Sequence, residues 1–188
     1  MSDKPIIFSA PMVRALLDGR KTQTRRILKP PYGTLEFQAN GTWKPICTKF
    51  FPGDRLWVRE ACATWVGELK DAAYRADETD AEWENLRHDA RLGFWKIRPS
   101  IHMPRWASRL TLIVTDVRVQ RLQDISRGDA MEEGCPFANM ADGPNPRDWF
   151  ADLWNSIHGP KAWAANPWVC ALTFTVHRQN IDQMEGEA

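Results

Sequence analysis

The sequence lacks any apolar run that approaches the ~20 residues a membrane-spanning helix needs. Its first residues, MSDKPIIFSAPM, also lack the basic, apolar and small-residue order of a secretory signal. We therefore expect a cytoplasmic location and no membrane partner. The 188 residues, 43% of them hydrophobic, are enough to bury one sizeable core.

Metal-binding patterns are missing as well. The cysteines and histidines follow no CxxC, HxH or HExxH spacing. The cysteines are Cys47, Cys62, Cys135 and Cys170. The sequence thus predicts reduced, partly buried thiols, with no metal and no cofactor.

Charge is unevenly distributed, although the net charge is only +1. Residues 14–29 carry six bases against one acid, and residues 96–109 carry four bases and no acid. Residues 68–89 carry eight acids against three bases. A surface polarised in this way suits phosphates or nucleic acid on its basic side. The alternative is that the three segments neutralise one another within the fold.

Hydrophobic patterning predicts both strands and short helices. Strands are expected at 6–8, 56–58, 109–122 and 167–177. The two longest are apolar on both faces, which is typical of central strands. Helices are expected between Ser9 and Gly19, around 81–92, between Ser126 and Gly134, and over 146–157. The third of these begins with an S-x-x-D capping box.

The order of these elements favours a small mixed or strand barrel over a doubly wound sheet. We expect a single domain over residues 1–180 with a frayed tail at 181–188. Insertions are expected at about 30–50, as an excursion or hairpin, and at about 67–98.

Two features suggest chemistry. Lys21 and Thr24 form a lysine–hydroxyl combination, in which a desolvated amine can take the hydroxyl proton or stabilise an oxyanion. Glu132 and Glu133 end a helix, where carboxylates oppose the helix dipole, so one of them is expected to have a function or a basic partner. The alternatives are a basic turn with threonines in a β-bridge, and two solvated glutamates.

Tryptophan is abundant, and most of the ten tryptophans are expected in the core. Trp106 lies between Arg105 and Arg109, an interleaving of aromatic and base that can stack on and neutralise a nucleotide. The alternative for Trp106 is a core position.

Taken together, several segments resemble the ASCH domain family of the PUA-like superfamily, and especially its longer phage and prophage members. They are GRKTQTRR, the PGD turn with its strand, TDVRVQRL, DAMEEG and the closing apolar strand. The family signature G-x-K-T-x-T-x-R is matched by Gly19, Lys21, Thr22, Thr24 and Arg26. The A-x-x-E-G helix end is matched by Ala130, Glu133 and Gly134.

The resemblance implies an α+β fold: a partly open β-barrel with short surrounding helices and a cleft at one mouth. Small bacterial members hydrolyse N4-acylated cytidines, chiefly N4-acetylcytidine, with a lysine, a threonine and a glutamate. The matching residues here are Lys21, Thr24 and Glu133. Expected substrate-binding residues are Arg26, Thr22, Arg20, Trp57, Arg105 and Trp106.

Three functions are therefore open. The first is an amidohydrolase acting on a modified cytosine nucleoside or nucleotide. The second is a module that binds RNA, single-stranded nucleic acid or a modified base, and the third is a ribonuclease with the same basic cleft. Arg98, Arg105 and Arg109 discriminate between them, because a polynucleotide track needs these arginines on the face that carries Lys21.

Overall fold

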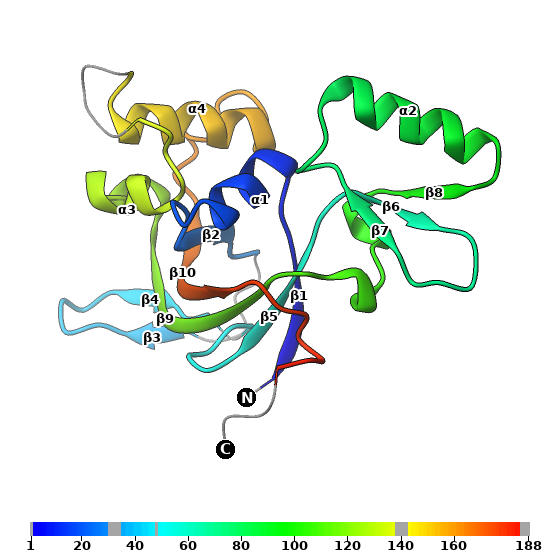
Figure 1. Cartoon of the computed structure of the whole chain (residues 1–188). Coiled ribbons are helices and arrows are strands. Elements are labelled where there is room, and N and C mark those ends of the chain that lie inside the picture. The colour runs from blue at the N-terminus through cyan, green and yellow to red at the C-terminus, as the bar shows by residue number, and fades with distance from the viewer. Residues whose placement is uncertain (1, 30–34, 48, 138–142, 185–188) are drawn as a thin grey trace. The chain divides into compact units, whose positions relative to one another are not determined.

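The computed structural model describes residues 2–29, 35–47, 49–137 and 143–184. These residues form a mixed α+β structure of strands and α-helices with three short 3-10 helices (Figure 1), which confirms the predicted class. The chain divides into two compact units. Unit 1 consists of residues 1–18, 54–113 and 176–188, and unit 2 consists of residues 19–53 and 114–175.

The largest sheet has five strands in the order β1-β5-β9-β10-β2. Their bounds are Asp3–Ile7 (β1), Arg55–Arg59 (β5), Thr111–Arg121 (β9), Trp168–His177 (β10) and Gln23–Ile27 (β2). Strand β1 runs parallel to β5, whereas the β5–β9 and β10–β2 pairs are antiparallel. The central place of β9 confirms the expectation from its two-sided apolar pattern. The described strands form open sheets, so no closed barrel is seen among them.

The α-helices in the described part of unit 1 are α1 (Ala10–Leu17) and α2 (Asp80–Arg91). Helix α1 begins after Ser9 with a proline in its first turn, as predicted, and buries Val13 and Leu16. Helix α2 has a full capping box between Thr79 and Glu82. It lies beside a three-stranded sheet that sequence patterning did not predict. The strands of that sheet are β7 (Ala72–Tyr74), β6 (Cys62–Trp65) and β8 (Trp95–Arg98).

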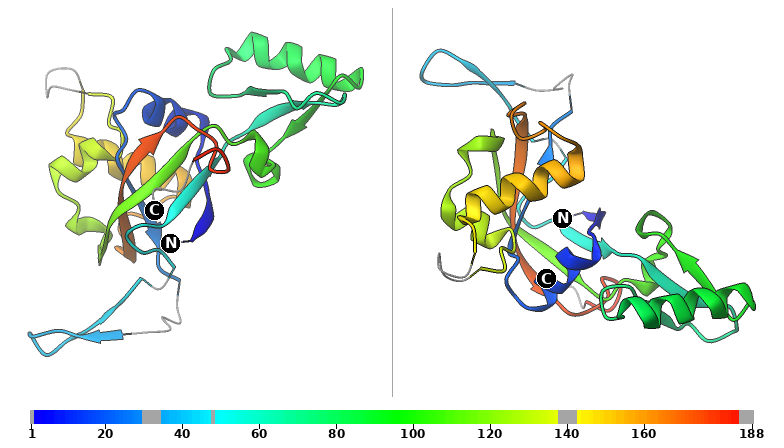
Figure 2. Two further views of the ribbon diagram at one scale, coloured as in Figure 1. Left: turned by 60° about the horizontal axis from the view of Figure 1, so that its bottom comes forward. Right: turned by 90° about the horizontal axis from the view of Figure 1, so that it is seen from above.

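Unit 2 contains helices α3 (Arg127–Glu132) and α4 (Pro146–His158) and the hairpin of β3 (Leu35–Phe37) and β4 (Trp43–Pro45). The hairpin lies within the predicted 30–50 excursion, part of which falls outside the described residues. Figure 2 shows it extending away from α3 and α4. Phe150 and Trp154 of α4 pack with Ala130 of α3 in one hydrophobic cluster. This packing fixes α3 against α4 and thereby places the carboxylates at the end of α3.

Candidate active site

The centre of the candidate site is a contact between Lys21 and Glu133, both in unit 2. The two residues form an isolated antiparallel β-bridge, and the Thr22 amide beside it donates to the Glu132 carbonyl at 2.8 Å. The Lys21 amine donates to the Glu133 carboxylate at 2.6 Å and to the Glu133 main-chain carbonyl at 2.8 Å. Lys21 is only 1% exposed and Glu133 only 3%. The helix-end glutamate therefore has the basic partner that its unfavourable position predicted.

Arg25 is a second cation on the same carboxylate. Its guanidinium donates to Glu133 Oε1 at 3.0 Å, and its Nη2 lies 3.4 Å from a carboxylate oxygen of Asp129. The Phe150 ring lies 5.8 Å from the guanidinium carbon. The Arg25 Nε has no hydrogen-bond partner among the described residues. Glu133 thus carries two buried cations, an arrangement that sequence reasoning missed.

Asp129 extends the cluster toward the surface. Its carboxylate accepts hydrogen bonds from Gln23 at 3.0 Å and from Arg118 at 2.9 Å, and also from the amide and the hydroxyl of Ser126 at the helix cap. Although burial opposes the shift, the bonds from Arg118, Gln23 and Ser126 hold the pKa of Asp129 below its usual value. Asp129 therefore remains an anion at neutral pH and fixes the β2 side chains to α3.

The protonation of Lys21 is set by opposing effects. Burial lowers the pKa of its amine, the Glu133 carboxylate raises it, and the charges of Arg26 and Arg25 lower it further. The net direction is downward. Burial also lowers the pKa of Arg26, while Glu133 opposes that shift. A lysine with a lowered pKa and a carboxylate partner can accept and return a proton, which is the chemistry expected of a general base.

Thr24 lies on β2, where it is 2% exposed and pairs in register with Leu172 of β10. Because side chains alternate along a strand, Thr24 and Arg26 project to one face of β2 and Gln23 and Arg25 to the other. Within the part of the chain that the structure describes, the Thr24 hydroxyl has no hydrogen bond to Lys21 or Glu133.

The remaining predicted substrate-binding residues fall into two groups. In unit 2, Arg20 donates to the Gly134 carbonyl at 2.9 Å, and the Thr22 carbonyl accepts from the Phe174 amide at 2.9 Å. Arg20 is thus tied to the residue that follows Glu133, and Thr22 to β10, the strand that pairs with β2.

The second group belongs to unit 1 and makes its contacts with other residues of that unit. It consists of Trp57, Arg105 and Trp106. The Arg59 guanidinium lies 5.3 Å from the centre of the Trp57 ring. Arg105 is bound by both Asp3 and Asp182, each at 2.6 Å. Trp106, 37% exposed, lines a cavity of about 530 Å³ within unit 1. Trp106 therefore borders an open space instead of filling the core.

No protein-family model, curated protein or solved structure matches the chain. Among the described residues, no cluster of three or more His, Cys, Asp or Glu side chains is arranged to hold a metal ion. None of the helices in the described ranges has the length and apolar character needed to cross a membrane.

Proposed function

We propose that this chain is an amidohydrolase of the ASCH type, which removes an acyl group from the exocyclic amine of a modified cytosine nucleoside or nucleotide. Its five-stranded sheet would form the core of the partly open barrel typical of that family. The observation that carries the proposal is the buried Lys21 amine, held at 2.6 Å from the Glu133 carboxylate with its pKa lowered. A buried cation and anion are costly to desolvate, which makes such a pair weak support for stability alone.

The proposed reaction assigns a role to each of three side chains. Lys21, in the neutral form that its lowered pKa makes accessible, takes the proton of the Thr24 hydroxyl, and the Thr24 oxygen attacks the acyl carbonyl. The bond between the carbonyl carbon and the cytosine N4 breaks, and the proton passes to N4 as cytidine leaves. Water then releases the acyl group from Thr24 as a carboxylic acid. Glu133 orients Lys21 and relays the proton to the departing exocyclic amine.

Arg26 is assigned to the substrate. It lies on the same face of β2 as Thr24, in register with Cys170 of β10. Its side chain is part-buried, and a cation beside the attacking hydroxyl suits an oxyanion or the cytosine carbonyl. The step therefore requires an acyl carbonyl next to Thr24 and the base next to Arg26.

The second basic segment, residues 96–109, gives less support to the two alternatives, a nucleic-acid-binding module and a ribonuclease. Arg98 donates to the Thr64 hydroxyl at 2.8 Å, Arg105 is bound by Asp3 and Asp182, and Arg109 is bound by Glu60 at 2.9 Å and by Asp77. These arginines are thus engaged by groups of their own unit. That favours a nucleoside-sized substrate over a polynucleotide track, which needs cations available to phosphates.

The discriminating experiment offers three substrates to the purified chain: N4-acetylcytidine, a short RNA with one N4-acetylcytidine, and the same RNA unmodified. The products are separated by chromatography. We expect cytidine from the nucleoside and no cleavage of either RNA strand. Cleavage of the unmodified RNA would support the ribonuclease instead, and salt-sensitive binding without deacylation would support the binding module.

A further inference from the structure

Arg25 is a buried arginine to which the proposed reaction gives no role. It occupies the variable position between Thr24 and Arg26 in the G-x-K-T-x-T-x-R signature, so the family resemblance gives it none either. Its side chain is 0% exposed and belongs to unit 2. A guanidinium stays charged in proteins, and a buried charge is costly unless it is paired. The contacts of Arg25 therefore indicate what it does.

The Arg25 guanidinium is fixed on several sides. Its Nη1 donates to Glu133 Oε1 at 3.0 Å and to Gln23 Oε1 at 3.1 Å. Its Nη2 lies 3.4 Å from Asp129 Oδ2, and its central carbon lies 5.8 Å from the centre of the Phe150 ring. These partners belong to β2, to α3 and its C-cap, and to α4. The guanidinium is thus held in place by three elements of the fold.

The two oxygens of the Glu133 carboxylate are divided between two cations. Oε1 accepts a hydrogen bond from Arg25, and Oε2 accepts one from Lys21 at 2.6 Å. A fixed donor on Oε1 sets the rotation of the carboxylate and thereby turns Oε2 toward Lys21. It also shares the negative charge of Glu133 between two cations instead of leaving it to one.

We propose that Arg25 is a positioning residue for Lys21: it holds the Glu133 carboxylate in place and limits how far that carboxylate stabilises the charged amine. Lys21 thereby stays available as a base. The inference rests on the proposed function, in which neutral Lys21 takes the proton of Thr24. Arg25 acts through Glu133 and is not assigned to the substrate.

The protonation of Lys21 responds to charge in the direction that this role requires. Burial lowers the pKa of the Lys21 amine, and Glu133 raises it. The charges of Arg26 and Arg25 lower it again. A cation at position 25 therefore opposes part of the effect of Glu133 and favours the neutral amine.

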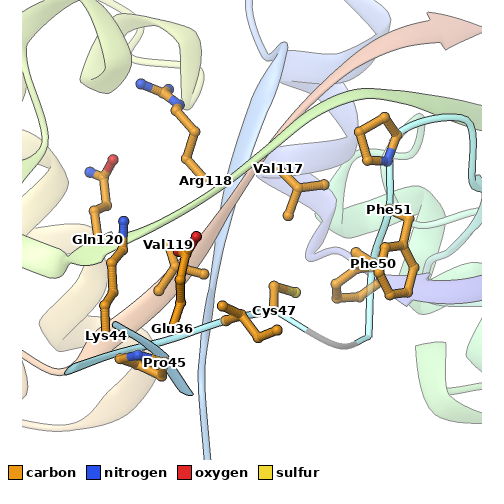
Figure 3. Close-up of a pocket in the computed structure, with 12 residues that line it drawn as sticks. Glu36, Lys44, Pro45, Cys47, Phe50, Phe51, Val117, Arg118, Val119 and Gln120 are labelled. Carbon is orange, nitrogen blue, oxygen red and sulfur yellow. The ribbon is translucent and has the colours of Figure 1, made fainter. Parts of the chain in front are cut away.

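The other acids around the pair have partners of their own. Arg118 of β9 donates to Asp129 at 2.9 Å. Figure 3, a close-up of a cavity of about 590 Å³ in unit 2, shows Arg118 leaving β9 on the side opposite to Val117. Glu132 accepts a hydrogen bond from a side-chain amide of β2. Glu133 is therefore the acid whose two oxygens bind the two buried cations.

NMR titration of the folded full-length chain, labelled with ¹³C at the lysine Cε carbons, tests the role without any substrate. Arg25→Gln should raise the pKa of Lys21, because a lowering charge is lost and Glu133 is left with one cation. Arg25→Lys restores a cation and should return the titration toward that of the wild type. Arg127→Gln removes an exposed arginine of α3 and is the matched control. An unchanged or lowered pKa in Arg25→Gln, or an equal rise in Arg127→Gln, would overturn the proposal.

The pH profile of N4-acetylcytidine turnover separates positioning from a loss of structure. Because the neutral amine is the base, kcat/KM rises with pH as Lys21 loses its proton. Arg25→Gln should move this rise to higher pH and lower kcat/KM about 10-fold at neutral pH, with KM nearly unchanged. A loss of equal size at every pH would indicate a structural role and overturn the proposal. No turnover by the wild type would contradict the proposed function, while the NMR titration still decides the role of Arg25.

A measurement on the wild type covers the case in which Arg25→Gln does not fold, as judged by circular dichroism. The ¹⁵N signal of the Arg25 Nε, assigned by its loss in Arg25→Lys, should shift as Lys21 titrates, since both cations bind one carboxylate. A signal that stays constant through that titration would show that the two cations are not coupled through Glu133, and it would overturn the proposal.

Discussion

The Lys21 amine donates one hydrogen bond to the carboxylate of Glu133 and another to its main-chain carbonyl, across a sequence separation of 112 residues. The contact joins a residue two positions before β2 to the C-cap of α3, and Arg25 of β2 binds the other carboxylate oxygen. Two cations therefore depend on one buried anion. This dependence makes the cluster sensitive to each of its members, in both stability and protonation.

Removing Glu133 should lower the pKa of Lys21 further. The Glu133 charge and hydrogen bond raise that pKa, whereas burial, Arg26 and Arg25 lower it, so Glu133→Gln leaves only the lowering effects. NMR titration of chain labelled with ¹³C at the lysine Cε carbons measures the shift directly. Glu132→Gln is the matched control and should leave the Lys21 titration in place. An unchanged or raised pKa in Glu133→Gln would contradict this account of the pair.

Arg25→Ala should destabilise the fold strongly. The Arg25 side chain is 0% exposed, and its loss leaves buried carboxylate charge without one of its partners. Removing one member of a buried ion pair costs about 3–5 kcal/mol of unfolding free energy. Urea unfolding gives the value. Arg91→Ala on α2, whose exposed side chain reaches Glu84 at 4.0 Å, should change stability by no more than ~0.5 kcal/mol. Equal effects of the two variants would refute the energetic role of Arg25.

The N-cap side chain of α3 should contribute more to thermal stability than the N-cap side chain of α1. Ser126 accepts a hydrogen bond from the Asp129 amide at 3.0 Å, whereas the Ser9 side chain makes no capping bond. Loss of a capping side chain costs about 1 kcal/mol. Ser126→Ala should therefore lower the thermal midpoint clearly, and Ser9→Ala should lower it less. The reverse order would show that the cap does not hold Glu133 in place.

Asp129 should make stability depend on pH in acid. Its folded pKa lies below the unfolded value of about 3.8, so its contribution is fully present above that value. The contribution is lost as pH falls from there through the folded pKa, because the unfolded chain binds the proton first. Urea unfolding between pH 7 and pH 3 should show a shallower acid loss for Asp129→Asn than for the wild type. Glu84→Gln, an exposed acid on α2, is the control; a slope unchanged in Asp129→Asn would contradict the assignment.

Local patterning predicted the elements that local physics determines. The S-x-x-D sequence predicted the capping box of α3, and the two-sided apolar runs predicted β9 and β10. The small sheet of β6, β7 and β8 was missed because its strands are three or four residues long, and β7 contains only Ala, Ala and Tyr. Strands this short carry no measurable alternation.

The site was predicted in part. Helix-dipole reasoning indicated a partner for one of the two helix-end glutamates, and the Lys21–Glu133 contact provides it. The second cation, Arg25, was not predicted as a partner of Glu133, since nothing local indicates that Glu133 and Asp129 lie opposite it. The pairing of Arg105 with Asp3 and Asp182 is equally non-local. Such contacts follow from the assembled sheet and helices and not from residue spacing.

The most direct test of Lys21 as the base of an amidohydrolase is turnover of N4-acetylcytidine by the wild type, by Lys21→Ala and by Lys29→Ala. Lys29 is an exposed lysine of the same basic segment. We expect the wild type and Lys29→Ala to release cytidine at similar rates. Lys21→Ala should lose about 100- to 10,000-fold, the range typical of a general base. No release by the wild type would contradict the proposed amidohydrolase activity, and equal release by Lys21→Ala would contradict the role of Lys21 as the base.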